Sequence, residues 1–237
     1  MTVIVSQKDY KLIFIHITKN AGCSVANSLL PLIWDKNLLN LYKKGKNIIP
    51  SIIRSSIKSN LPGRGDPITF LAREYLRKFK GIKDHMKSLE IENLLGEEIF
   101  SEYYSFAVSR NPYSREVSLY RYLQKSKKSK SYELVKSFKE FDNFVNYRCS
   151  KKIPLQKYFV VNKKDKLMIN KILKLENLNE EFKVMCKSLK VPSILKIPHI
   201  NSSGANVDWR SFYNNETRKK VSEAFAEDFE FFNYDKT

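Results

Sequence analysis

The stretch KLIFIHITKNAGCS, from Lys11 to Ser24, places a short apolar run directly before a lysine, a glycine, a cysteine and a serine. A buried strand is predicted over 12–17, and a helix is expected to begin near Gly22 and to run to about Leu30. A helix start that follows a strand presents free backbone N–H groups and a partial positive charge, which together bind anions. The stretch is therefore typical of a phosphate-binding turn in an α/β fold.

This turn differs from the standard loop that binds nucleoside triphosphates. The standard loop reads GxxxxGK[ST], with its lysine after the second glycine, whereas Lys19 here precedes Gly22. In a phosphate site, Lys19 would add a full charge, Gly22 would let the backbone pass close to a ligand, and Ser24 would offer a hydroxyl. The alternative is a basic turn that happens to precede a helix, and the stretch alone leaves both open.

The composition predicts one folded domain with an anionic partner. The chain has 237 residues, of which 42% are hydrophobic, and this suits a single α/β domain over 1–237. The formal net charge is +18. Nucleic acid, an anionic membrane surface, an acidic glycan and a polyanionic nucleotide are all candidate partners.

The cysteines and the first residues predict a soluble, cytoplasmic protein, which fits a microbial or viral source. Cys23, Cys149 and Cys186 are odd in number and lack any metal-binding or CxxC spacing, which indicates reduced thiols. The N-terminus lacks the apolar core of a signal peptide. No window approaches the ~20 apolar residues that span a bilayer.

Predicted strands and helices alternate along the rest of the chain. Strands are expected at 103–109 and 172–176, a hairpin or two short strands at 158–169, and helices at 47–58, 68–79, 88–101, 112–123, 141–148, 180–189 and 215–232. Ser137 and Glu140 form a possible capping box before the helix at 141–148. This alternation predicts a three-layer α/β fold with a mostly parallel central sheet.

A second stretch, FAVSRNPYSREVSLYRYL at 106–123, also suits a phosphate. Arg110 ends a buried strand, Pro112 opens a helix, and Ser118 lies two helical turns beyond Arg110. Both side chains can therefore reach one ligand at the carboxyl edge of the sheet, where open α/β sheets bind their ligands. The alternatives are that Arg115 pairs with a surface carboxylate, Glu116 or Glu102, and that Ser118 faces the core.

Together the two stretches resemble sulfotransferases that use 3′-phosphoadenosine 5′-phosphosulfate (PAPS), in particular the carbohydrate branch that includes the heparan sulfate 2-O-sulfotransferases. That branch typically has FIHIPKTAGTS in its 5′-phosphosulfate loop and a VRNPYxRLVSxY-like stretch at its 3′-phosphate site. This chain has FIHITKNAGCS and VSRNPYSREVSLY in the same order. LENL at 175–178, PHIN at 198–201 and a closing aromatic helix extend the likeness over about 10–235. It implies the P-loop-like α/β fold of sulfotransferases.

The resemblance implies a role for each matching residue. The 5′-phosphosulfate would be cradled by Lys19, Asn20, Ala21, Gly22, Cys23 and Ser24, and the 3′-phosphate would be held by Arg110 and Ser118. Lys19 would also act in catalysis, by stabilising charge on the bridging oxygen as the nucleotide PAP leaves. A loop reading PHINSSG, with Ser202 and Ser203, would close over the nucleotide.

Three residues of the first stretch depart from the branch's pattern. Thr18 stands where proline is usual, Asn20 where a threonine is usual, and Cys23 where the threonine after the glycine is usual. The missing hydroxyl at Cys23 removes one side-chain hydrogen bond to the phosphate, while the backbone N–H remains. These departures bear on affinity, and they leave open a member that binds the nucleotide without catalysis.

The acceptor hydroxyl needs a base, and His85 is the candidate. It lies upstream of Arg110, close to the position of the catalytic histidine in the resembling enzymes, and histidine suits proton transfer at neutral pH. Without the resemblance, a capping or surface histidine would be the better interpretation. His16 is expected within a strand, satisfying a core hydrogen bond, and His199 as a loop anchor or a nucleotide contact.

The resemblance implies a hydroxyl acceptor, a sugar or an acidic glycan. The variable insert 31–81 lies between the two motifs and is expected to shape the acceptor site, with a surface excursion as the equal alternative. A lipid head group, a small metabolite and a protein tyrosine stay open. No metal is expected, because a sulfuryl group carries less negative charge than a phosphoryl group, and the second strand ends at Arg110 rather than at a magnesium-binding aspartate. The rival functions are a metal-dependent nucleotide or small-molecule kinase and a basic nucleic-acid-binding protein.

Overall fold

The structure is a computed structural model that describes residues 2–6, 10–33, 82–125, 127, 131–151, 153–191, 197 and 208–236. Its strands are β1 (Val3–Ser6), β2 (Lys11–Ile15), β3 (Tyr104–Ser109) and β4 (Lys171–Lys174). Its helices are α1 (Gly22–Ile33), α5 (Ser88–Leu95), α6 (Glu97–Glu102), α7 (Pro112–Lys125), α8 (Tyr132–Ser137), α9 (Phe141–Cys149), α10 (Leu178–Ser188), α11 (Asn215–Ala224) and α12 (Ala226–Phe231). Short 3₁₀ turns lie at Lys157–Phe159, Leu175–Asn177 and Trp209–Phe212.

The four described strands form one sheet in the order β1-β2-β3-β4. β2, β3 and β4 are parallel to one another, and β1 runs antiparallel to β2. The prediction of a mostly parallel sheet is therefore confirmed, while the edge strand β1 was not predicted. Because β2 and β3 pair with Ile15 opposite Ala107, and β3 and β4 with Ser109 opposite Lys174, their carboxyl ends meet at one edge.

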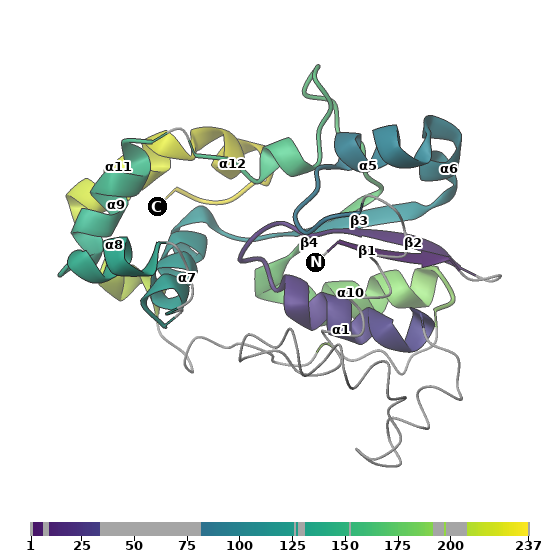
Figure 1. The fold of residues 1–237 in the computed structure, drawn as a ribbon, viewed down its shortest axis with the longest axis horizontal. Helices are drawn as coiled ribbons and strands as arrows, with labels where there is room; N and C mark the ends of the chain where they lie inside the picture. The colour runs from purple at the N-terminus through teal and green to yellow at the C-terminus, as the bar shows by residue number, and fades with distance from the viewer. Residues whose placement is uncertain are drawn as a thin grey trace, which may run out of the picture.

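Helices cover both faces of this sheet, as Figure 1 shows: α1 and α10 lie on one face, and α5 and α6 on the other. Alternate residues of β2 explain the arrangement. Phe14 packs in the cluster that includes α1 and α10, whereas Ile13 and Ile15 pack in the cluster that includes α5 and α6. Apolar residues on both faces are typical of a strand buried within a parallel sheet. The predicted three-layer α/β architecture is confirmed.

A group of helices lies beyond the carboxyl edge of the sheet, with α7, α8, α9 and α11 gathered at one end of Figure 1. Their shared core is rich in aromatic residues, and Tyr113 at its centre is fully buried. Val221, Phe225 and Phe229 are buried together there, as their helical spacing predicted. The single closing helix expected at 215–232 is instead two helices, α11 and α12, that meet at Phe225.

Other boundaries differ from the sequence predictions for local reasons. The helix expected at 88–101 is broken at Gly96, whose φ of 88° is outside the helical range. The predicted capping box is wrong, because Ser137 ends α8 with its hydroxyl donating to Leu134, and Glu140 makes no side-chain cap. The expected hairpin at 158–169 reduces to one antiparallel bridge, between Val161 and Leu167.

Two further differences concern the ends of elements. β4 stops at Lys174, where the strand expected at 172–176 gives way to a 3₁₀ turn. α1 continues to Ile33, three residues past the predicted end at Leu30. The helices expected at 47–58 and 68–79, with the rest of the insert from residue 34 onward, lie outside the described residues.

Candidate functional site

The loop between β2 and α1 has an unusual backbone. Lys19 and Ala21 both have positive φ, 69° and 55°, which costs an ordinary L-residue about 1–2 kcal/mol. The turn is closed by Asn20, whose N–H donates to the carbonyl of Ile17 (3.3 Å), and Val25 donates to the carbonyl of Ala21 as α1 begins (3.0 Å). Left-handed residues in such turns direct neighbouring N–H groups to one concave side, which is how backbone nests bind anions.

Gly22 is needed here because His16 packs directly against it. A Cβ at Gly22 would overlap the His16 imidazole, so the close approach expected at this glycine is made by the chain's own side chain. The core hydrogen bond expected for His16 is not made by its Nδ1, which is buried without a hydrogen-bond partner among the described residues; the residue as a whole is 7% exposed. His16 follows β2 rather than lying within it.

Two arginines hold the outer carbonyls of the loop. Arg110 donates from Nη1 to the carbonyl of Lys19 (3.1 Å), and Arg115 donates from Nε to the carbonyl of Thr18 (3.3 Å). Since these carbonyls are bound by guanidinium groups, the loop presents them away from an incoming anion. The Arg115 side chain is buried, and its Nη1 has no partner within the part of the chain that the structure describes.

The surface pairing considered for Arg115 is not formed. Glu116 is instead bound by Arg148 through two hydrogen bonds of 2.7 and 3.0 Å, and Glu102 pairs with Lys11. Arg115 is thus a buried cation beside the loop.

Burial of these cations shifts their acid–base behaviour. Desolvation, reinforced by the nearby charge of Arg110, lowers the pKa of Lys19 to about 8. Desolvation also lowers the pKa of Arg110 to about 10, with the charge of Arg115 acting in the same direction and that of Glu176 opposing it. The cationic form is disfavoured at each of these groups, so an anion bound among them would relieve an existing electrostatic cost.

One face of α7 supplies further contacts to the loop. Residues 115, 118 and 122 share this face because of their helical spacing. Arg115 contacts Thr18, and the ring of Tyr122 lies 4.0 Å from Nζ of Lys19, in a cation–π contact. Ser118 lies between these two positions on the helix and is buried, which fits both a place beside the loop and the alternative that it faces the core.

His85 lies against the same loop from the other side. Its Nδ1 is 3.2 Å from the hydroxyl oxygen of Thr18 and 3.2 Å from the carbonyl oxygen of His16. Its ring is 4.2 Å from the ring of His16, between centroids, and its φ is positive, 60°. Thr18, one of the departures from the typical pattern, therefore contacts the candidate base.

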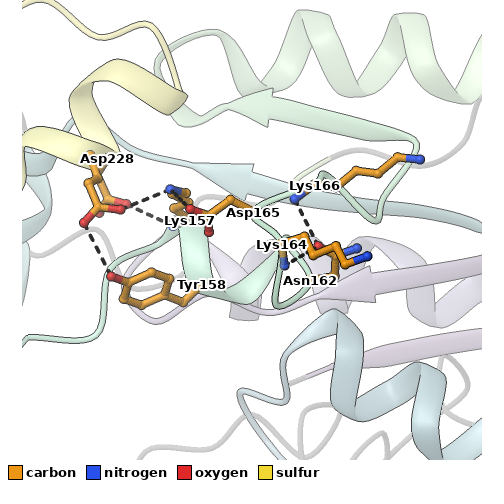
Figure 2. Close-up of polar contacts among 8 residues, drawn as sticks. Lys157, Tyr158, Asn162, Lys164, Asp165, Lys166 and Asp228 are labelled. Atoms are coloured by element: carbon orange, nitrogen blue, oxygen red, sulfur yellow. Dashed lines mark hydrogen bonds and ion pairs between the residues drawn. The ribbon is translucent and has the colours of Figure 1, made fainter.

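A buried amide–carboxylate pair, Gln156 and Asp228, supports the loop from the protein interior. Gln156 accepts from the side-chain Nδ2 of Asn20 (2.6 Å) and bonds both main-chain groups of Arg110. Asp228 accepts from the backbone N–H groups of Gln156 and Lys157, each at 2.9 Å; Figure 2 shows Asp228 facing Lys157. Burial raises the pKa of Asp228, and these two N–H groups oppose the shift.

Comparison with known proteins gives the family of the chain. A family model described as "Sulfotransferase family" matches residues 2–235. The chain belongs to the sulfotransferase family. A crystal structure of a sulfotransferase from Alicyclobacillus acidocaldarius shares 13% sequence identity over 98% of each chain, with a TM-score of 0.39. No curated protein matches the chain.

The structure gathers most of the sequence-predicted site residues. Lys19, Ala21, Gly22, Cys23 and Ser24 lie in the loop or in the first turn of α1, Arg110 and His85 contact the loop, and Ser118 lies on α7. Asn20 differs, because its side chain is fully buried and donates inward, to Gln156 and to the carbonyl of Val108 (2.7 Å). Ser202, Ser203 and His199 lie outside the described residues.

Sequence reasoning missed three residues that contact the loop or its supports. Tyr122 had a usable signal, because it follows Ser118 by one helical turn. Gln156 and Asp228 had none, since they meet the site only through contacts that span many residues of chain.

Two features are absent from the described part of the chain. There, no three or more His, Cys, Asp or Glu side chains lie together as metal ligands would. Nor does any helix of that part have both the length and the apolarity to cross a bilayer.

Proposed function

We propose that this protein transfers a sulfuryl group from PAPS to an acceptor hydroxyl. The observation that carries the proposal is the gathering of Lys19, Arg110 and Arg115 around the loop at the start of α1, where burial disfavours the charge of each. Membership of the sulfotransferase family supports it. A site that holds buried cations at a cost suits a multiply charged anion, and PAPS carries anionic groups at both ends of its nucleoside.

The proposed donor site has two arms. The loop N–H groups, with Cys23 and Ser24 in the first turn of α1, would bind the 5′-phosphosulfate. Arg110 and Ser118 would bind the 3′-phosphate, for which a guanidinium and a hydroxyl are well suited. The residues present fit such a ligand, since the buried Nη1 of Arg115 lacks a partner among the described residues.

In the proposed mechanism His85 is the general base. It would take the proton of the acceptor hydroxyl as the acceptor oxygen forms its bond to sulfur. The sulfur–oxygen bond to the 5′-phosphate breaks in the same in-line displacement, and its electron pair stays on the phosphate of PAP. Lys19 would stabilise the negative charge that develops on that bridging oxygen.

The contact of His85 with the loop supports this assignment. Nδ1 lies within reach of the His16 carbonyl oxygen and the Thr18 hydroxyl. A hydrogen bond from Nδ1–H to this carbonyl would fix the tautomer in which Nε2 accepts the proton. His85 is also solvent-exposed, as a base that meets an external acceptor must be.

We further propose a carbohydrate acceptor, a sugar or an acidic glycan. The resemblance of both motifs to the carbohydrate branch supports this choice, as does the net charge of +18, which favours an anionic partner. Segment 31–81 is proposed to shape the acceptor site, and Ser202 and Ser203 to contact the nucleotide.

A transfer assay tests the proposal. The purified protein is incubated in EDTA with sulfur-labelled PAPS and a panel of neutral sugars, acidic glycans and tyrosine peptides. We expect label in a carbohydrate fraction. Phosphoryl transfer from ATP that requires Mg²⁺, with no transfer from PAPS, would contradict the proposal and favour a kinase.

A further inference from the structure

We propose that Gln156 couples the two arms of the donor site, so that the 5′ loop and the 3′ arm bind one bisphosphorylated nucleotide together better than they bind its halves. The inference rests on the proposed function, because it assumes a nucleotide with a phosphate at each end. Gln156 touches neither phosphate in this proposal; it is a positioning residue.

The contacts of Gln156 reach both arms with a single carboxamide. Its Oε1 accepts from Nδ2 of Asn20 in the loop (2.6 Å) and from the backbone N–H of Arg110 (3.0 Å). Its Nε2 donates to the carbonyl of Arg110 (2.9 Å). The side chain is fully buried, so no water competes for these bonds.

Arg110 is held by this carboxamide at the point where the sheet stops supporting it. β3 ends at Ser109, and both main-chain groups of the next residue are bonded to Gln156 instead of to a neighbouring strand. The Arg110 guanidinium then reaches across to the carbonyl of Lys19 (3.1 Å). Loop, amide and guanidinium therefore form a closed ring of contacts, and a shift in one arm is passed to the other.

Asp228 fixes the amide in turn. Its carboxylate, fully buried on α12, accepts from the N–H groups of Gln156 and Lys157 and lies 3.4 Å from Nε2 of Gln156. Figure 2 shows this carboxylate beside the Lys157 segment and the adjoining turn around Asn162. The turn is itself closed, since Oδ1 of Asn162 accepts from the N–H groups of Lys164 and Lys166. The amide is thus held by Asp228, which also binds the segment that begins at Lys157.

Loss of the coupling should change the relative affinities for PAP and for the monophosphates, whereas a general destabilisation of the fold should weaken all of these ligands alike. Each arm alone can bind a monophosphate wherever the other arm lies. Only a ligand with both phosphates needs the two arms at a set separation. Loss of the Gln156 contacts should therefore weaken PAP more than it weakens adenosine 5′-phosphate or adenosine 3′-phosphate.

The test compares wild type with Gln156→Met, which keeps the length of the side chain and removes its polar atoms. Binding of PAP and of the two monophosphates is measured by calorimetry in EDTA. We expect PAP to weaken by about ten-fold or more, as the loss of a buried hydrogen-bonding partner would predict. Each monophosphate should weaken by less than about three-fold, because it uses one arm only. Equal weakening of all three ligands, or no weakening, would overturn the proposal.

A matched control lies at the other end of the same strand. Oδ1 of Asn170 accepts from the N–H and the hydroxyl of Ser105 (2.7 and 3.0 Å), far along β3 from Arg110. Asn170→Leu removes a comparable side-chain support of β3 and should leave the affinity ratio between PAP and the monophosphates unchanged. A change in that ratio as large as for Gln156→Met would overturn the proposal, because it would show a general response of β3.

A second variant keeps the test decisive if Gln156→Met fails to fold. Gln156→Asn keeps an uncharged amide beside Asp228, but its side chain is one methylene shorter, so it cannot hold Asn20 and both main-chain groups of Arg110 at once. It should lower PAP affinity selectively, by a smaller factor, and an unchanged ratio would overturn the proposal. If wild type itself does not bind PAP, the proposed function fails; if wild type binds PAP and the variants show no selective loss, only the coupling fails.

Discussion

Two lysines, Lys19 in the loop after β2 and Lys157 beside the turn at 162–166, show opposite ways of holding a cation. Lys19 forms no ion pair with any described residue, rests on the ring of Tyr122, and has its pKa lowered to about 8 by burial. Lys157 pairs with Asp165 (2.9 Å) and Glu227 (3.1 Å), and the hydrogen bond to Asp165 is the main reason that its pKa is raised.

The difference separates a cation that is available to a ligand from one that is paired within the protein. A paired lysine has its charge satisfied within the protein and gains little from a ligand. An unpaired, partly buried lysine gains an interaction when an anion arrives. The net charge of +18 does not make this distinction, whereas the local environment of each lysine does.

The largest effect is expected for the base. His85→Ala should lower kcat by about 10²–10⁴-fold, the usual contribution of a general base, and leave PAP affinity nearly unchanged. Steady-state kinetics and calorimetry measure the two quantities. The matched change in the turn region, Asp165→Asn, should leave kcat unaltered. Unchanged turnover in His85→Ala would remove this residue from the mechanism.

The same substitution at both lysines tests whether they differ in their contribution to kcat/KM. Lys19→Met should lower kcat/KM for PAPS by about 10²–10³-fold, because the charge that stabilises the leaving oxygen is lost. Lys157→Met should change kcat/KM by less than about two-fold, since the ion pairs of Lys157 with Asp165 and Glu227 take no part in the reaction. Similar losses in both variants would contradict the distinction between the two lysines.

The pH dependence of kcat/KM follows from the lowered pKa of Lys19. This ammonium is protonated below pH 8 and loses its proton as the pH rises through about 8. Since kcat/KM reports the free enzyme, it should fall by about ten-fold per pH unit above that value. In Lys19→Arg the fall should move to higher pH, and a fall at the same pH would assign it to another group.

The packing of His16 on Gly22 predicts an effect on stability. Gly22→Ala should lower the free energy of unfolding by about 1–3 kcal/mol, because the added methyl overlaps the imidazole. In the double variant Gly22→Ala/His16→Ala, room is restored and part of this loss should be recovered. Chemical denaturation of wild type, Gly22→Ala, His16→Ala and the double variant measures the coupling energy between the two residues. Additive losses would show that the two residues do not oppose each other.

The smallest expected effects are changes of opposite sign in the free energy of unfolding of the two lysine variants. Lys19 is destabilising in its protonated form, and this cost is fully present below its folded-state pKa of about 8 and disappears as the pH rises to 10.5. Lys19→Met should therefore raise the free energy of unfolding at pH 7 by on the order of 1–3 kcal/mol. Lys157→Met should lower it by about 0–1 kcal/mol. A loss of stability in Lys19→Met would contradict the electrostatic account.

The parts of the fold that could be predicted from the sequence are those determined by neighbouring residues. The apolar run of β2, the turn at Lys19 and the start of α1 lie within one short stretch, and Arg110 and Pro112 mark the end of β3 and the start of α7 just as locally. The family likeness of both stretches then indicated a sulfotransferase, which the family model confirms.

The parts that could not be predicted depend on contacts between distant segments. Gln156 meets Asn20 and Asp228 only in the folded chain. β1 is an edge strand of four residues whose pairing with β2 decides its conformation. The burial of the Asn20 side chain also depends on these long-range contacts. For that reason Asn20 was predicted from its position in the loop to bind the ligand, and its inward contacts were not predicted. Local patterns thus located the site, and tertiary contacts determined what supports it.

Thermal unfolding shows whether the loop and Arg110 form a PAP-binding site. The protein is heated in EDTA alone and with PAP, ADP or ATP, each at the same concentration. A ligand at ~100 times its dissociation constant adds about 2.7 kcal/mol of stability, which is an easily measured shift. We expect PAP to raise the unfolding temperature clearly more than ADP or ATP does. No shift with PAP, or an equal shift with ATP, would contradict it.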